Sequence, residues 1–116
     1  MNTAPVIRQL DQLDGVPCPC GIARRAFAEV EHFPATVHLT EISRQAEVHY
    51  HRRQTEVYVV LACQSGAAIE LDGVAHPVQP QTAVLIPPGV RHRGVGEMTV
   101  LIICTPKFDP ADEYLD

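Results

Sequence analysis

Short apolar runs separated by turn-forming residues dominate the chain from residue 34 to residue 104. Ten prolines and seven glycines divide the 116 residues into pieces, and the turn signals in this region are QSG, DG, QPQ, PPG and GVG. The runs between them are rich in Val, Ile, Leu, Tyr and Thr, most of which favour strands. No helical pattern lies between the runs, as a βαβ arrangement would require. The sequence therefore predicts an all-β sandwich or barrel in a single domain.

The two ends of the chain differ from this central region. The segment GIARRAFAEVEHF at residues 21–33 is expected to form a short helix or an irregular arm. The tail FDPADEYLD resembles a helix start, with Asp109 as the cap and Pro110 at the first helical position, although it could also be a terminal strap. We divide the chain into an N-terminal arm that packs on the barrel (1–33), a β-barrel (34–106) and a C-terminal tail (107–116).

Charge and hydropathy limit the class of protein. The formal net charge is −5 and the basic residues form no stripe or tail, which argues against nucleic-acid binding. No apolar run approaches the ~18 residues that a membrane helix needs. The N-terminus lacks the basic start and apolar stretch of a signal peptide. We therefore expect a cytoplasmic protein whose partners include neither nucleic acid nor membrane.

The four cysteines are interpreted as free thiols, because the cytosol is reducing. Cys18 and Cys20 could instead be half of a zinc site or a redox pair, but no second cysteine pair lies at a suitable spacing. Cys63 and Cys104 each end an apolar run, and both are expected to be small buried hydrophobic residues.

The segment HYHRRQTE at residues 49–56 places three metal-ligating side chains close together. In a helix, His49 and His51 would lie about 200° apart, whereas in a strand residues i and i+2 point to the same face. Glu56 lies an odd number of residues from both histidines, so the chain must turn or bulge at RRQT before the next strand begins. The arrangement requires two neighbouring strands that curve around a common interior.

A further histidine follows a turn in IPPGVRHR at residues 86–93, where prolines and a glycine fix the backbone before His92. Imidazoles suit Zn, Cu, Fe and Ni, and a carboxylate also admits Mn. On a six-coordinate ion, three histidines and one carboxylate leave two positions for water, substrate or dioxygen. We predict a divalent transition metal (Fe, Mn, Zn or Ni) bound by His49, His51, Glu56 and His92.

Other side chains could act beside this cluster. Glu56 could leave the metal and act as a base, and Tyr58, on the same strand face, is our other candidate catalytic residue, although a core tyrosine fits equally well. Arg24 and Arg25 could anchor an anionic substrate if the N-terminal arm closes the barrel mouth. The remaining histidines are interpreted as ordinary loop or strand residues: His32, His38 and His76.

These residues resemble the two motifs of the cupin superfamily. In that family, His-x-His and a glutamate that opens the next strand form the first motif, and Pro-x-Gly-x-x-His ends the second. The matching positions here are His49, His51, Glu56, Pro87, Gly89 and His92. Three positions that carry glycine in the family hold Ser43, Cys63 and Gln81, but every metal-ligand position is filled.

The resemblance implies a double-stranded β-helix, or jelly roll, with the metal near its centre, and a homodimer. The family includes dioxygenases, isomerases, lyases and sensor domains, so the fold does not select the reaction. We expect a metal-dependent enzyme acting on a small molecule, and we favour a dioxygenase because the ligand set resembles that of non-haem iron cupins. A metal-dependent isomerase or lyase, a non-catalytic small-molecule binding or sensor protein, and a vestigial site are the alternatives.

Overall fold

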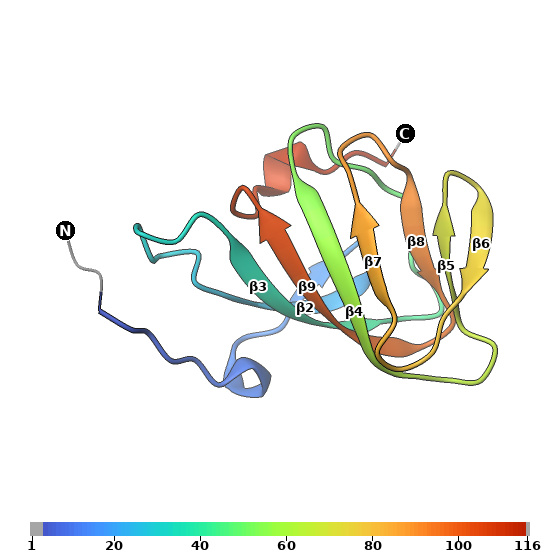
Figure 1. Cartoon of the computed structure of the whole chain (residues 1–116), viewed down its shortest axis with the longest axis horizontal. Coiled ribbons are helices and arrows are strands. Elements are labelled where there is room, and N and C mark those ends of the chain that lie inside the picture. The colour runs from blue at the N-terminus through green and yellow to red at the C-terminus, as the bar shows by residue number, and fades with distance from the viewer. Residues whose placement is uncertain (1–3, 116) are drawn as a thin grey trace.

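The computed structural model describes residues 4–115, and this range forms β-strands and two 3-10 turns without an α-helix (Figure 1). The strands are β1 (Val16–Cys18), β2 (Gly21–Ala26), β3 (Thr36–Ile42), β4 (Thr55–Cys63), β5 (Ala68–Leu71), β6 (Val74–Pro77), β7 (Ala83–Ile86), β8 (His92–Val95) and β9 (Met98–Thr105). The 3-10 turns are η1 (Leu10–Gln12) and η2 (Pro110–Asp112). The prediction of an all-β fold is confirmed. None of the described segments is a helix long and apolar enough to cross a membrane.

Two antiparallel sheets enclose one interior. The larger sheet has the strand order β1-β2-β3-β9-β4-β7, and the smaller has the order β6-β5-β8. Figure 1 shows β5, β6 and β8 grouped at one side of the molecule, with β3, β9 and β4 at the other. Several paired strands, such as β3 with β9 and β5 with β8, are far apart in the sequence, as in a jelly roll. The predicted jelly-roll architecture is therefore confirmed.

Alternation along the central strands decides which side chains enter the interior. In β3 the four alternate residues from Thr36 to Ile42 are buried, and the residues between them are more exposed. Strand register aligns the inward residues in rows across the larger sheet. One row contains Thr36, Cys104, Glu56 and Ile86, and the next contains Arg25, His38, Ile102, Tyr58 and Val84. Polar side chains therefore enter the interior at the end of the barrel where β3 and β4 begin.

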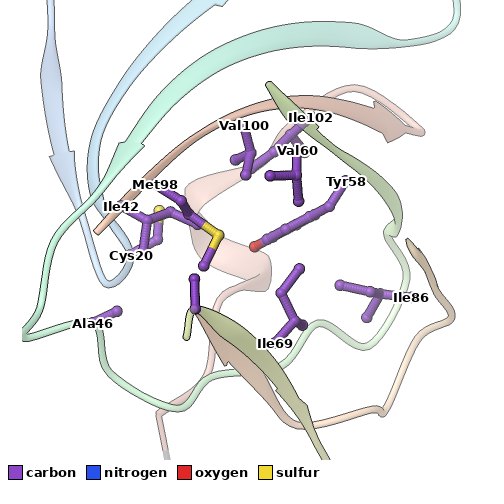
Figure 2. Packing of buried hydrophobic residues seen from close by; sticks show 11 residues of the cluster. Cys20, Ile42, Ala46, Tyr58, Val60, Ile69, Ile86, Met98, Val100 and Ile102 are labelled. Atoms are coloured by element: carbon purple, nitrogen blue, oxygen red, sulfur yellow. The ribbon is translucent and has the colours of Figure 1, made fainter. Parts of the chain in front are cut away.

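Apolar side chains fill the rest of the interior, as Figure 2 shows. Val60 and Val100 of the larger sheet and Ile69 of the smaller sheet have no exposed surface. The two sheets approach closely at Gly94 on β8, where a Cβ atom would lie 2.7 Å from Cγ2 of Ile42. Because any larger residue would push the sheets apart, glycine at this position allows the core to close.

Residues 21–26 form neither the short helix nor the irregular arm that the sequence predicts for residues 21–33. Residues Gly21–Ala26 form β2, which pairs antiparallel with β3, and β1 pairs with β2. A Cβ atom at Gly21, whose φ is +148°, would lie 2.1 Å from the carbonyl oxygen of Glu41. Glycine therefore lets β2 start close against β3, and this tertiary pairing outweighs the helix propensity of the local sequence. Residues 27–35 form no helix or strand, as expected for an irregular arm.

The free-thiol prediction is wrong for one pair of cysteines. Cys18 and Cys20 form a disulfide at the β1–β2 turn, with their Cα atoms 5.3 Å apart. The prediction rested on the expected compartment, whereas the turn brings the two side chains within bonding reach. Cys63 and Cys104 are free, and Cys104 is fully buried while Cys63 is half-buried.

Candidate metal centre

Four buried side chains converge inside the barrel. His49, His51, Glu56 and His92 each offer one ligand atom, and these atoms all lie within 4.8 Å of one another. Glu56 is the second residue of β4 and His92 is the first residue of β8, whereas the other two histidines lie in the segment that precedes β4. The structure thus brings together all four residues that the sequence predicted as metal ligands.

Backbone hydrogen bonds join the segments that carry these histidines. The amide of His49 donates to the carbonyl of His92 at 3.1 Å, and the amide of His92 donates back at 2.9 Å. The amide of Gly89 donates to the carbonyl of His51 at 2.7 Å. The two sequence motifs, about forty residues apart, are therefore held side by side by main-chain contacts.

Two of the imidazoles are oriented by backbone carbonyls. Nδ1 of His49 lies 3.1 Å from the carbonyl oxygen of Glu47, and Nδ1 of His92 lies 2.9 Å from that of Val90. A carbonyl accepts a hydrogen bond, so both rings carry their proton on Nδ1 and present the Nε2 lone pair to the interior. This is how metal-ligating histidines are commonly fixed.

The acidic member of the cluster lies between two histidines. Oε1 of Glu56 is 3.2 Å from Nε2 of His92 and 3.5 Å from Nδ1 of His51. Burial opposes ionisation of Glu56, but its close contacts with His92 and His51 outweigh burial, so the pKa of Glu56 is lowered. Burial also lowers the pKa of His51, and lowers that of His49 to about 4. Three imidazoles with one anionic carboxylate form a donor set that fits a divalent transition metal.

The C-terminal tail clamps the loop between His51 and Glu56. The buried carboxylate of Asp112 accepts hydrogen bonds from the amides of Arg52, Arg53 and Gln54 at 2.9, 3.0 and 3.1 Å. Burial would raise the pKa of Asp112, but these bonds outweigh burial and lower it to about 2. No spacing pattern predicts this contact, because the partners are about sixty residues apart.

The same tail also pairs with the histidine segment itself. Tyr50, between the two ligand histidines, exchanges backbone hydrogen bonds of 3.0 Å with Tyr114, and their rings stack with centroids 5.3 Å apart. The predicted helix start is confirmed, since η2 begins at Pro110 and the side chain of Asp109 accepts a bond from the amide of Ala111. The tail therefore functions as a strap as well as a helix start.

Two titratable groups lie near the cluster without belonging to it. His38 is buried on the inner face of β3, with Nε2 2.8 Å from Oγ1 of Thr36, and burial lowers its pKa to about 4. Glu113 is half-buried and follows Asp112 in the tail. Burial raises the pKa of Glu113, and the charge of Glu56 raises it further. Arg25 and His92 act in the opposite direction but do not cancel this rise. His38 therefore differs from His32 and His76, which were also expected to be ordinary histidines and are exposed.

The predicted catalytic tyrosine lies at the edge of the same group. Tyr58 is 1% exposed, and its ring meets that of His92 edge-on with centroids 5.9 Å apart. Burial and the nearby charge of Glu56 raise the pKa of Tyr58 well above its ordinary value. Its hydroxyl therefore keeps its proton and can only act as a neutral hydrogen-bonding group.

A groove of about 540 Å³ lies at the other end of β3, β4 and β9. Its acidic residues are partnered within the protein: Glu41 accepts a hydrogen bond from Thr99 at 2.8 Å, and Glu97 lies 3.9 Å from Arg44. Within residues 4–115, no group of metal-ligating side chains lines this groove, so the candidate site is the cluster at the polar end of the barrel.

Comparison with known proteins identifies the family. Among solved structures, a protein from Planctomyces limnophilus is 46% identical over 97% of both chains, with a TM-score of 0.92. A variant of Streptomyces PAC13 with uridine is 19% identical over 97% of this chain and 95% of its own, with a TM-score of 0.79. Ectoine synthase from P. lautus is 14% identical over 95% of this chain and 88% of its own, with a TM-score of 0.74. At these low identities, the likeness of the last two proteins to this chain shows a common fold and nothing more.

None of the curated proteins matches this chain. The model of the family described as "Cupin domain" matches residues 36–104, which is more than half of the chain and contains all four residues of the cluster. The chain therefore belongs to the cupin family.

Proposed function

We propose that this cupin binds one divalent transition metal through His49, His51, Glu56 and His92 and catalyses the elimination of water from a small polar molecule. The observation that carries the proposal is the presence of two titratable groups near the cluster: His38, on the inner face of the sheet one row from Glu56, and Glu113, in the tail segment that pairs with Tyr50. Chemistry confined to the metal and dioxygen would not need such groups, whereas elimination requires a side chain that moves a proton.

A divalent metal held by the cluster would supply a Lewis acid that polarises a substrate oxygen. Glu113 is the proposed proton-transfer group, because its raised pKa makes its carboxylate a stronger base. It would take a proton from a carbon beside the polarised group and return it to a hydroxyl on the next carbon. That hydroxyl leaves as water and a carbon–carbon double bond remains, so the reaction needs no oxidant or reductant.

The other groups have supporting roles in this proposal. His38, neutral because of its low pKa, would accept or donate a hydrogen bond to the substrate. Glu56 would remain the anionic ligand, and Tyr58 would act as a neutral hydrogen-bond donor. PAC13 is a nucleoside dehydratase, which supports testing dehydration first and including nucleosides among the substrates.

Proton transfer can be tested before the natural substrate is known. The metal-loaded protein is incubated in D₂O with a panel of hydroxy acids, sugar acids and nucleosides, and ¹H NMR follows deuterium incorporation and loss of water. We expect one class of compound to exchange or dehydrate, Glu113→Gln to lose this activity, and Glu97→Gln, at the far end of the barrel, to retain it. Saturable binding of a compound without exchange or turnover would instead indicate a binding or sensor protein.

A dioxygenase is the second candidate, and the donor set favours it. Three histidines and one carboxylate leave two coordination positions on a six-coordinate ion, enough for a substrate and dioxygen. An oxygen electrode run on the same panel with iron-loaded protein separates the two reactions. Stoichiometric oxygen uptake without deuterium exchange would replace the lyase proposal by the dioxygenase.

We further propose a homodimer in the cytoplasm. Support for the dimer comes from an apolar row across the outer face of the larger sheet, which contains Val37, Ile103, Val57 and Leu85. Leu85 is 66% exposed and Leu61, on the same strand face as Val57, is 48% exposed. Light scattering coupled to size exclusion should give twice the mass of 12.7 kDa, and Leu85→Glu should give the single mass.

A further inference from the structure

Two adjacent arginines on β2 point to opposite sides of the larger sheet. Arg25 is in register with His38, whose side chain is buried on the inner face, whereas Arg24 is in register with Leu39 on the outer face. The guanidinium of Arg24 lies near Gly15, outside the barrel. Of the two candidate anchors in the sequence, only Arg25 is on the side of the metal cluster.

The guanidinium of Arg25 is held in place by an aromatic ring. Its Cζ atom lies 3.6 Å from the ring centroid of Phe108. That ring is itself fixed, because it meets the ring of His38 edge-on with centroids 5.6 Å apart and the amide of Phe108 donates to Oγ1 of Thr36 at 3.1 Å. Stacking leaves the edge of a guanidinium available for two parallel hydrogen bonds. Arg25 is thus preorganised beside the polar rows.

The positive charge of Arg25 has no direct counter-charge among residues 4–115. No carboxylate in that range forms an ion pair with it, and Glu113 and Glu56 attract it only over longer distances. Burial therefore lowers the pKa of Arg25. Half-burial of an unpaired guanidinium is unfavourable unless an anion joins it.

Two buried polar atoms accompany this charge. Nε of Arg25 and Oγ1 of Thr40, which is the next inward residue after His38 on β3, both lack a hydrogen-bond partner in the described part of the chain. An unpaired Nε is also found in Arg24 and in Arg93. What distinguishes Arg25 is that it lies on the inner side of the sheet, the side of Thr40 and of the metal cluster.

We propose that Arg25 binds an oxyanion, a carboxylate or phosphate, on the small molecule whose other end reaches the metal cluster. The inference rests on the proposed function in one respect, namely that the substrate reacts at the metal cluster. Arg25 and Tyr58 lie in one inner row separated by three strand spacings, ~14 Å along the curved sheet. The length of an arginine side chain shortens this separation, so the distance suits a metabolite-sized anion. A bidentate pair with a carboxylate or phosphate is the contact that a stacked guanidinium favours.

The anchor can be tested on the full-length metal-free protein, without turnover. The Nε–H signal of Arg25 is assigned in ¹H–¹⁵N spectra by its loss in Arg25→Gln, and the protein is titrated separately with inorganic phosphate and with acetate. We expect at least one of them to shift the Arg25 signal saturably, and the stronger one identifies the class of oxyanion. Arg25→Gln should weaken binding about tenfold or more, Arg25→Lys should weaken it less, and Arg24→Gln should leave it unchanged.

The proposal is overturned if neither anion shifts the Arg25 signal, or if folded Arg25→Gln binds the anions as tightly as the wild type. Circular dichroism checks folding, and if Arg25→Gln does not fold, the wild-type titration and Arg25→Lys decide the question. Because no metal and no reaction are involved, a missing anchor would leave the elimination proposal intact. Conversely, if Arg25 binds the anions but the metal-loaded protein shows no exchange or dehydration, the elimination proposal is refuted and the anchor proposal is not.

Discussion

The two ends of the barrel interior are held together by different forces. At the far end, Ile42, Val100 and Ile69 are closely packed apolar side chains, and their stabilisation grows with the area removed from water. At the metal end, buried imidazoles and carboxylates are oriented by hydrogen bonds to the backbone and by the C-terminal tail. Buried polar groups stabilise a fold only when they are satisfied. We therefore expect substitutions at the far end to change stability and substitutions at the metal end to change metal binding.

The largest expected effect is the loss of a ligand. His51→Ala should weaken metal binding on the order of a thousandfold, more than the 10–100-fold typical of a residue that only supports a ligand. Since a metal that binds the folded state raises its stability by mass action, the wild type should gain melting temperature with Fe, Mn, Zn or Ni. His51→Ala should gain none, and the exposed His76→Ala should behave like the wild type.

Removing packed volume at the far end should affect stability alone. Ile69→Ala should lower the free energy of unfolding by about 3–4 kcal/mol, because Ile69 has no exposed surface. Urea denaturation measures this loss, and the folded variant should still bind one metal ion per chain with wild-type affinity. A large change in metal affinity would contradict the expectation that the two ends of the barrel act independently.

Cutting the clamp should affect both properties. Asp112→Ala leaves the amides of Arg52, Arg53 and Gln54 without their acceptor, and we expect a loss of about 3 kcal/mol in stability. Metal affinity should also fall, about 10–100-fold, as the loop before Glu56 loosens. Titration calorimetry and urea denaturation measure the two effects, with the exposed Asp14→Ala as a control. An unchanged affinity would show that the tail does not position the ligands.

Acid should remove the clamp reversibly. The pKa of Asp112 is lowered from 3.8 to about 2, so its contribution to stability is complete above about pH 4 and is lost as the pH falls through about 2. We expect up to about 2 kcal/mol from this group. Urea midpoints of the metal-free protein between pH 4 and pH 2 should fall more steeply for the wild type than for Asp112→Asn. Parallel curves would contradict this assignment.

The sequence predicts the parts of this molecule that depend on neighbours in the chain. Alternation in HYH and the turn at RRQT placed His49, His51 and Glu56 around one interior, and the structure brings them together with His92, although their role as ligands remains a prediction. Apolar alternation likewise predicted the strands of the barrel. Both signals are local, because they follow from the two-residue period of a strand.

The features that were missed depend on contacts between distant residues. The strand β2 forms because residues 21–26 pair with β3, and Asp112 reaches the ligand loop from about sixty residues away. His38 is expected to be an ordinary histidine, because its alternation with Val37 and Leu39 does not indicate which face of β3 is buried; the packing of the two sheets decides this. Neither composition nor spacing indicates such pairings. The contacts of Asp112 and the positions of His38 and Glu113 near the cluster could therefore not be predicted from the sequence.

Whether the four side chains hold a metal is decided by a crystal structure of the protein loaded with one equivalent of Zn or Mn, with anomalous data collected at the metal edge. We expect a single anomalous peak inside the barrel, about 2.0–2.2 Å from nitrogen atoms of His49, His51 and His92 and from a carboxylate oxygen of Glu56. A metal bound elsewhere on the chain, or a fully loaded site in which these four side chains point apart, would contradict it.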